Sequence, residues 1–156
     1  ARVAILDVDA HHGNGTQDVF WQNPSVLTVS IHADPAHDYP YFSGYTDEIG
    51  GGAGEGFNMN VPLAPGSTWE TYAGALSAAA SRIRDFAPDY LVVALGVDGY
   101  SNDPSGKLNL ERADYSRIGE AIAALSIPKM FVFEGGYDKA AIGDCAARVL
   151  EPSKGL

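Results

Sequence analysis

The composition of this 156-residue chain is that of one folding unit with an acidic surface. With 46% hydrophobic and 19% charged residues, the chain can bury one substantial core, and we interpret residues 1–156 as a single domain. The net charge of -10 argues against direct binding of nucleic acid and suits cationic partners such as amines, although ordinary acidic solubility explains the charge equally well. Cys145 is the only cysteine, which excludes an internal disulfide and favours a cytoplasmic location. No apolar run is long enough to predict a membrane span.

Short β-branched runs alternate with helical patterns along the chain, which is typical of an α/β domain with a mostly parallel sheet. Strands are predicted at 2–8, 26–31, 57–61, 90–95 and 129–133. Helices are predicted at 15–22, from a capping box at 67–70 through 83, at 114–125 and at 139–150. Residues 33–56 are rich in Pro, Gly and aromatic side chains, and a loop of this length indicates a functional segment.

Two carboxylates and two imidazoles lie at the end of the first predicted strand. Alternate side chains of an extended segment share a face, so Asp7, Asp9 and His11 are predicted to point one way and His12 the other. A mixed oxygen and nitrogen set suits zinc, and cobalt or ferrous iron also fits it. A single Asp or His at a strand end is more simply explained by turn capping or a satisfied buried hydrogen bond. Four such groups within six residues favour a metal site.

Two further strand ends supply candidate residues, because ligands of open α/β sheets bind beyond the carboxyl ends of the strands. Asp98 follows a Gly bend and could be a third metal ligand, although turn capping is the alternative. Tyr137 follows Gly135 and Gly136 and could donate its phenol proton to an oxyanion beside the metal. Taken alone, Tyr137 is more simply a packing residue.

Together, these motifs resemble the histone deacetylase and acetylpolyamine amidohydrolase family. The resemblance rests on DVDAHHGNGTQ at 7–17, GVD at 96–98 and EGGY at 134–137, in the family's order and across nearly the whole chain. It implies a three-layer, arginase-like α/β fold with a mostly parallel sheet. The family's tandem catalytic histidines normally precede the strand that contains Asp7. The chain therefore resembles the carboxyl-terminal portion of the domain, truncated at the amino-terminal side.

The resemblance also implies roles for individual residues. Asp9, His11 and Asp98 would be zinc ligands, and Tyr137 would polarise the acetyl carbonyl of the substrate. The implied reaction is hydrolysis of an acetylated amine, either an acetylpolyamine or acetyl-lysine, with release of acetate.

Other family positions surround this implied centre. Asp7 and Asn14 match residues that support the catalytic histidines, and the Asn form looks like the class II and acetylpolyamine branch. Tyr39 would line the substrate tunnel, where aromatic walls can flank an aliphatic amine. A satellite hydrophobic cluster under the long loop is an equally good interpretation of its aromatic residues. A structural potassium ion would be held by a set that overlaps the zinc ligands: Asp7, Asp9, His11, Ser30 and Ile31.

Two alternatives to a complete hydrolase follow from the sequence. His12, His32 and His37 do not match the tandem pair, so the chain could be a metal-binding module with little or no catalysis that binds amines or other proteins. A truncated sheet would also expose an apolar edge, which predicts a homo-oligomer. A nucleotide or phosphate binder built on the glycine-rich run 50–56 is disfavoured, because the run has neither dinucleotide nor P-loop spacing.

Overall fold

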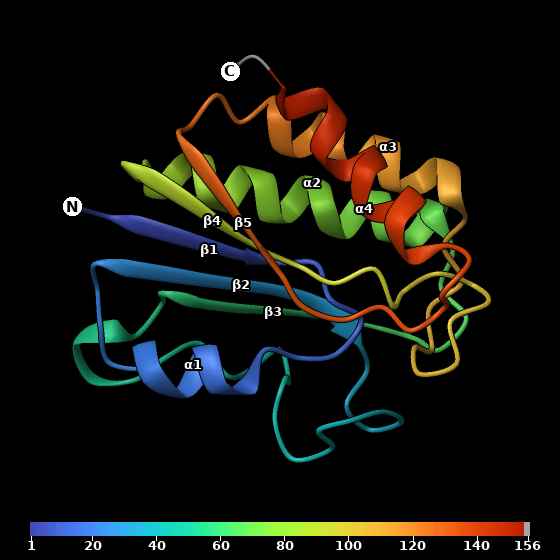
Figure 1. The fold of residues 1–156 in the computed structure, drawn as a ribbon. Helices are drawn as coiled ribbons and strands as arrows, with labels where there is room; N and C mark the ends of the chain where they lie inside the picture. The colour runs from blue at the N-terminus through green and yellow to red at the C-terminus, as the bar shows by residue number, and fades with distance from the viewer. Residues whose placement is uncertain (155–156) are drawn as a thin grey trace.

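A computed structural model describes residues 1–154, and its centre is a five-stranded sheet between two helical layers (Figure 1). The strands are β1 (Val3–Asp7), β2 (Val26–Ala33), β3 (Asn58–Leu63), β4 (Tyr90–Leu95) and β5 (Lys129–Phe133). Their order across the sheet is β3-β2-β1-β4-β5, and each neighbouring pair is parallel. The predicted parallel α/β sheet is thereby confirmed.

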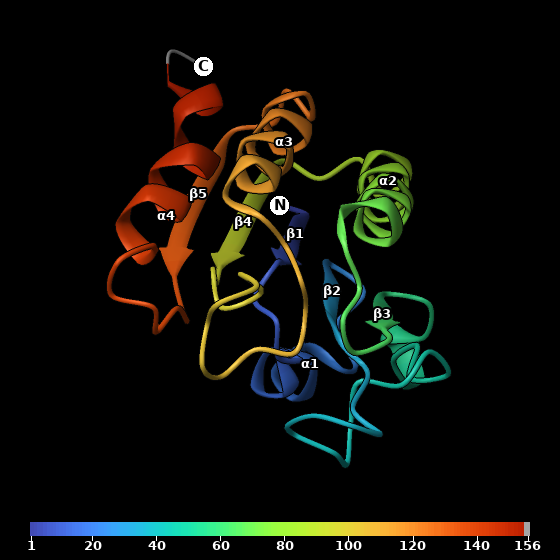
Figure 2. The same cartoon turned by 90° about the vertical axis from the view of Figure 1, so that its right-hand side faces the viewer.

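The helices complete a three-layer arrangement. They are α1 (Asn14–Phe20), α2 (Trp69–Phe86), α3 (Arg112–Ala123) and α4 (Ile142–Leu150), with short 3-10 turns at Gly52–Gly54 and Glu151–Ser153. Helices α2, α3 and α4 cover one face of the sheet, and α1 lies against the other (Figures 1 and 2). Within residues 1–154, no helix is both long and apolar enough to cross a membrane.

The core lies between the sheet and the layer formed by α2, α3 and α4. Strand β2 is buried along its whole length, as expected for a strand with neighbours on both sides and layers on both faces. On α2, Tyr72, Leu76, Ala79 and Ile83 are buried at three- and four-residue spacing, so one stripe of the helix faces the sheet. Each large apolar side chain buried in this way contributes about 1.5–3 kcal/mol to stability.

Strand β5 differs from the central strands, because it forms an edge of the sheet and keeps much of its surface exposed. Met130, Val132 and Phe133 are all exposed apolar side chains of this strand. The other edge strand, β3, is more deeply buried. An apolar edge at β5 is therefore observed, as the sequence predicted.

Two predicted helix starts are wrong. No capping box forms at 67–70, because α2 begins at Trp69 with Thr68 as its N-cap and no side-chain cap. The last helix begins at Ile142 and not at 139, because Asp138 bonds to the backbone of the next residues and forms a separate turn. Side-chain capping occurs instead at α3, where the Asp114 carboxylate accepts a hydrogen bond from the backbone N–H of Glu111 (2.8 Å).

Candidate metal centre

The site lies where the chain leaves the carboxyl ends of β1, β4 and β5. From β1 the chain proceeds to β2 on one side, and β4 later joins β1 on its other side. Such a reversal of strand order opens a crevice in which α/β proteins bind ligands. The segments after β1, β4 and β5 carry Asp9 and His11, Asp98, and Tyr137, respectively.

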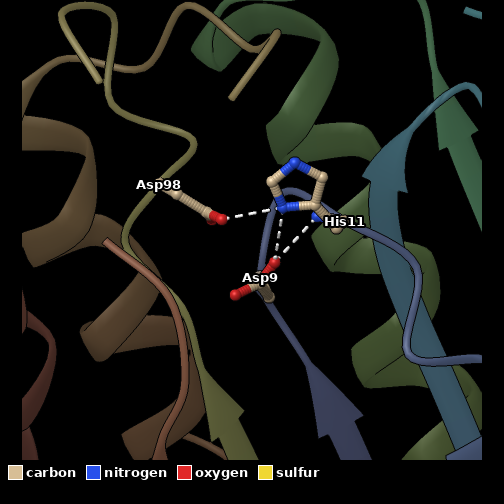
Figure 3. Close-up of side chains that lie close together, drawn as sticks. All are labelled: Asp9, His11 and Asp98. Carbon is tan, nitrogen blue, oxygen red and sulfur yellow. Dashed lines mark hydrogen bonds and ion pairs between the residues drawn. The ribbon is translucent and has the colours of Figure 1, made fainter. Parts of the chain in front are cut away.

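Asp9, His11 and Asp98 converge in this crevice (Figure 3). Nδ1 of His11 lies 2.8 Å from Oδ2 of Asp98 and 3.2 Å from Oδ1 of Asp9. One potential ligand atom from each residue lies within 4.8 Å of the others. The structure brings these three side chains together, but not through the alternation of an extended strand. Strand β1 ends at Asp7, so a bend and not strand alternation aims Asp9 and His11 at Asp98.

Backbone hydrogen bonds hold this arrangement. Asp9 Oδ1 accepts the N–H of His11 (2.8 Å), and Asp98 Oδ1 accepts the N–H of Ala10 (2.8 Å). The other oxygen of Asp9 accepts the N–H of Gly135 at 3.1 Å. Both carboxylates are therefore fixed by the backbone before any ligand arrives, which lowers the cost of organising a metal site.

Glycine is required where the loop after β5 approaches the two carboxylates. A Cβ atom on Gly135 would lie 2.6 Å from Oδ2 of Asp9 and 2.7 Å from Oδ2 of Asp98. A methyl group at this position would therefore displace one or both carboxylates. A nitrogen and carboxylate oxygens around such a space are a suitable donor set for zinc.

The electrostatics of the centre are those of a crowded acidic site. Hydrogen bonds to Asp9 and Asp98 raise the pKa of His11 to about 10, so its ring carries a proton at neutral pH when no metal displaces it. Burial, with a smaller contribution from Asp9, raises the pKa of Asp98. Burial and the neighbouring Asp9 likewise raise the pKa of Asp7 well above its usual value. A bound cation would offset the repulsion between the negatively charged carboxylates of Asp7, Asp9 and Asp98.

Tyr137 lies on the same cleft as the metal cluster. The cleft has a volume of about 570 Å³, and its wall includes Asp7, Asp9, His11, Glu134 and Tyr137. The side chain of Tyr137 is 58% exposed. Partial burial, followed by the negative charges of Asp98 and Asp9, raises its pKa, so the phenol keeps its proton at neutral pH. Tyr137 is thus available as a hydrogen-bond donor to a group in the cleft.

The other predicted site residues lie around this centre. Asp7 is buried and accepts the N–H of Asp9 at 3.0 Å, and Asn14 begins α1 at the cleft wall. Tyr39 also lines the cleft, and its ring meets the His11 ring edge-on, with centroids 6.3 Å apart. Ser30 and Ile31 are buried in β2, and Ser30 pairs in register with Asp7.

The remaining histidines are engaged elsewhere. His12 is buried with its ring centroid 4.7 Å from that of His32. Burial and the neighbouring His32 lower the pKa of His12 to about 3. His32 lies between the Ser30 hydroxyl (2.8 Å) and the carbonyl of Gly44 (2.9 Å), and His37 is exposed in the long loop. Neither the His12–His32 pair nor His37 matches the tandem of catalytic histidines expected for the family.

The glycine-rich run 50–56 has a packing role. Gly51 donates its N–H to the carbonyl of Trp21 (2.9 Å), and a Cβ on Gly51 or Gly54 would collide with Trp21 or the residue after it. The run therefore lies against the end of α1, and this close approach of two backbones requires glycine. This contact explains the glycines without a phosphate ligand.

Sequence reasoning missed two residues of the site. Glu134 lines the cleft next to the metal cluster. Asp103 is 8% exposed and bonds to the backbone of Tyr137 and Asp138. The Asp-Pro-Ser-Gly sequence at 103–106 is a turn signal that could have drawn attention to Asp103, but its contact with the loop after β5 is visible only in three dimensions.

This geometry agrees with the comparisons with known proteins. Residues 1–152 match the histone deacetylase domain, and the chain belongs to that family. It is 55% identical over 154 residues to acetylpolyamine amidohydrolase 1 of Pseudomonas aeruginosa, and 43% identical over 150 residues to the acetylpolyamine amidohydrolase of Mycoplana ramosa. These matches cover 99% and 96% of this chain, and 44% of each relative.

A solved structure gives the same result. The crystal structure of the acetylpolyamine aminohydrolase from Burkholderia pseudomallei superposes with a TM-score of 0.96 at 40% sequence identity. The match covers 100% of this chain and 46% of that one. The predicted deacetylase-like fold is therefore confirmed, and the chain spans less than half the length of the relatives that it matches.

Proposed function

We propose that this chain carries the metal-binding and carbonyl-polarising part of a zinc-dependent amidohydrolase that removes acetyl groups from acetylated amines and releases acetate. The observation that carries the proposal is the convergence of Asp9, His11 and Asp98 on the cleft that Tyr137 also lines. Similarity to proteins named acetylpolyamine amidohydrolase supports an acetylated amine as the substrate.

Asp9, His11 and Asp98 would hold the zinc ion, which supplies Lewis-acid polarisation of the acetyl carbonyl when bound. Tyr137 is positioned on the same cleft to donate its hydroxyl proton in a hydrogen bond to the oxygen on which negative charge develops. Because its pKa is raised, Tyr137 remains a donor throughout the neutral range.

The substrate class follows from the walls of the cleft. Asp7, Asp9 and Glu134 make its surface acidic, and the ring of Tyr39 adds an aromatic wall. An aliphatic amine with a remaining positive charge suits both features. We therefore favour acetylpolyamines, with acetyl-lysine as the related alternative.

Proton transfer is the part of the reaction that the described residues do not supply. His12 and His32 are buried against one another, and His37 lies exposed in the loop. Asp7 and Asn14 match family positions that support catalytic histidines, and we propose that role for them. A second candidate function follows from this observation: a metal-binding deacetylase-like module with little or no turnover, acting as an amine-binding or interaction protein.

A structural potassium ion is proposed near the zinc site. Its ligands would be the side chains and carbonyl groups of Asp7, Asp9, His11, Ser30 and Ile31. Burial of Asp7, which makes its negative charge costly, supports a cation at this position.

The exposed edge of the sheet supports a proposal about assembly. Met130, Val132 and Phe133 would be covered by association of two copies along β5. Light scattering should then give a mass above that of one chain, and a clean monomer at high concentration would contradict the proposal. The lone buried cysteine, Cys145, is in keeping with a reducing cytoplasm.

The test is hydrolysis of acetylputrescine and of an acetyl-lysine peptide by the zinc-loaded chain, with metal content measured on the same samples. Turnover that is lost in both Asp98→Ala and Tyr137→Phe supports the proposed reaction. Stoichiometric zinc without turnover in the wild type supports the metal-binding module instead. Absence of zinc binding contradicts both.

A further inference from the structure

Tyr137 is the reactive tyrosine of the proposed site, yet little around its own side chain fixes its place. The side chain is 58% exposed, and it follows two glycines, of which Gly136 has a φ of 142° that other residues rarely adopt. Packing alone therefore does not place the hydroxyl in the cleft. The position of Tyr137 must be set through its backbone.

The backbone of Tyr137 is held by Asp103. One oxygen of the Asp103 carboxylate, Oδ2, accepts the N–H of Tyr137 at 2.6 Å and the N–H of Asp138 at 3.0 Å. The other oxygen, Oδ1, accepts the N–H and the hydroxyl of Ser105 at 2.9 Å and 2.8 Å. Four hydrogen bonds thus saturate a carboxylate that is only 8% exposed.

Asp103 lies on the loop after β4, five positions beyond the proposed zinc ligand Asp98. Its contacts with Tyr137 and Asp138 join this loop to the loop after β5. A second junction between the two loops lies on the other side of Gly136, where Val97 donates its N–H to the carbonyl of Gly135 (2.8 Å). Hydrogen bonds therefore hold both ends of the segment that contains the tyrosine, and Asp103 is the residue that binds the backbone of Tyr137 itself.

The charge of Asp103 suits this task. Burial acts to raise its pKa, but the hydrogen bonds from Tyr137, Ser105 and Asp138 outweigh that effect and lower the pKa below its usual value. The carboxylate is ionised at neutral pH, so one oxygen can accept from Tyr137 and Asp138 while the other accepts from Ser105. An amide side chain has a single accepting oxygen. It could accept from the donors of the loop after β4 or from those of the loop after β5, but not from both.

We propose that Asp103 is a positioning residue that fixes Tyr137 at the cleft relative to the metal ligands. This inference rests on the proposed function, in which the hydroxyl of Tyr137 meets the acetyl carbonyl. A displacement of about 1 Å can cost up to about 100-fold in rate. Loss of the hydrogen bonds to Asp103 should therefore lower kcat while leaving zinc affinity unchanged.

The first test is backbone hydrogen exchange, which needs no activity. In Asp103→Ala, the amides of Tyr137 and Asp138 should exchange at least about tenfold faster than in the wild type, because each loses its acceptor. Asp103→Asn, which keeps the side-chain volume, should lie between the two. Asp114→Asn removes the charge of another buried aspartate that accepts a backbone N–H, and it should leave the 135–138 segment unchanged. Unchanged exchange at Tyr137 in Asp103→Ala would overturn the proposal.

The second test asks whether Asp103 acts through Tyr137. Asp103→Ala is combined with Tyr137→Phe in a double-mutant cycle, with kcat, KM for acetylputrescine and zinc affinity measured for each variant. Asp103→Ala should lower kcat about 10- to 100-fold when Tyr137 is present and have little further effect in the Tyr137→Phe background. Equal losses in both backgrounds would indicate a general structural role and overturn the proposal. If the zinc-loaded wild type has no turnover, hydrolysis by this chain is ruled out in favour of the metal-binding module, and the exchange experiment still decides the role of Asp103.

Discussion

The two sides of the cleft differ in how completely this chain builds them. On the metal side, Asp9 and Asp98 are held by backbone N–H groups of Ala10, His11 and Gly135. On the aromatic side, formed by Tyr39 and Tyr137, the two side chains are 54% and 58% exposed. Metal binding should therefore be a property of this chain alone, whereas turnover depends on how precisely the open side is organised.

Tyr137→Phe should separate the two sides most strongly. Removal of the phenol hydroxyl should lower kcat for acetylputrescine about 100- to 1,000-fold, which is typical for the loss of one donor to a developing oxyanion. Zinc affinity should stay the same, because the proposed ligands Asp9, His11 and Asp98 are unchanged in this variant. Tyr41→Phe, at another exposed tyrosine of the long loop, serves as the control and should retain activity. Equal activity of the two variants would show that Tyr137 is not part of the reaction.

Asp98→Ala should have the opposite signature. It removes a ligand and leaves the imidazole of His11 with one carboxylate partner, so zinc affinity should fall by more than about 100-fold, the upper range for loss of an outer-shell partner. Competition with a chromophoric chelator measures this loss. Asp144→Ala, at a half-buried aspartate of α4 that pairs with Arg148 away from the cleft, should bind zinc like the wild type. Wild-type affinity in Asp98→Ala would remove this residue from the ligand set.

Gly135→Ala tests whether the close approach of the β5 loop matters. A Cβ at this position would press on both metal carboxylates, so zinc affinity should fall about 10- to 100-fold. Gly74→Ala is the matched control, because a Cβ at Gly74 in α2 meets nothing within 4 Å. That variant should keep zinc affinity and raise stability by about 0.5–1 kcal/mol. A Gly135→Ala protein with normal zinc affinity would mean that the carboxylates can move freely.

His12 should make the metal-free protein sensitive to acid. Burial, and to a lesser extent His32, lowers its pKa in the folded state to about 3, against about 6.5 when unfolded. The unfolded state therefore binds more protons between these values, and stability falls as pH drops from about 6.5 toward 3. The loss from His12 is at most about 1.4 kcal/mol per pH unit.

Urea unfolding at a series of pH values measures this effect. His12→Phe should flatten the slope between pH 4 and about 6.5, whereas His37→Gln, at an exposed histidine, should not. An unchanged slope in His12→Phe would show that His12 is not buried in its neutral form.

Residues whose position follows from the strand pattern could be predicted from the sequence, whereas contacts set by local bends or by distant segments could not. Asp9, His11 and Asp98 could be predicted because they follow apolar strands at one edge of a parallel sheet, where strand ends meet. The bend that aims Asp9 and His11 could not, because β1 ends at Asp7 and the turn depends on side-chain to backbone bonds. The contact between Asp103 and Tyr137 spans 34 positions, and nothing local signals it.

The fold shows the same division. Strand positions and the buried stripe of α2 follow from period-two and helical patterns. The start of α4 at Ile142 could not be predicted from helix propensity, because Asp138 binds the backbone of the residues that would have continued the helix. Competition of a short polar side chain with helical hydrogen bonds is decided by the local geometry.

The most direct test of the account is zinc X-ray absorption spectroscopy on this chain, metal-stripped and reloaded with one equivalent of zinc. We expect a tightly held ion with a single imidazole nitrogen and carboxylate oxygens at about 2.0–2.2 Å, all from Asp9, His11 and Asp98. The signal should be the same in Tyr137→Phe and lost in Asp98→Ala. Two or more imidazole ligands, a sulfur ligand, or an unchanged spectrum in Asp98→Ala would contradict the claim that this chain alone builds the metal side of the cleft.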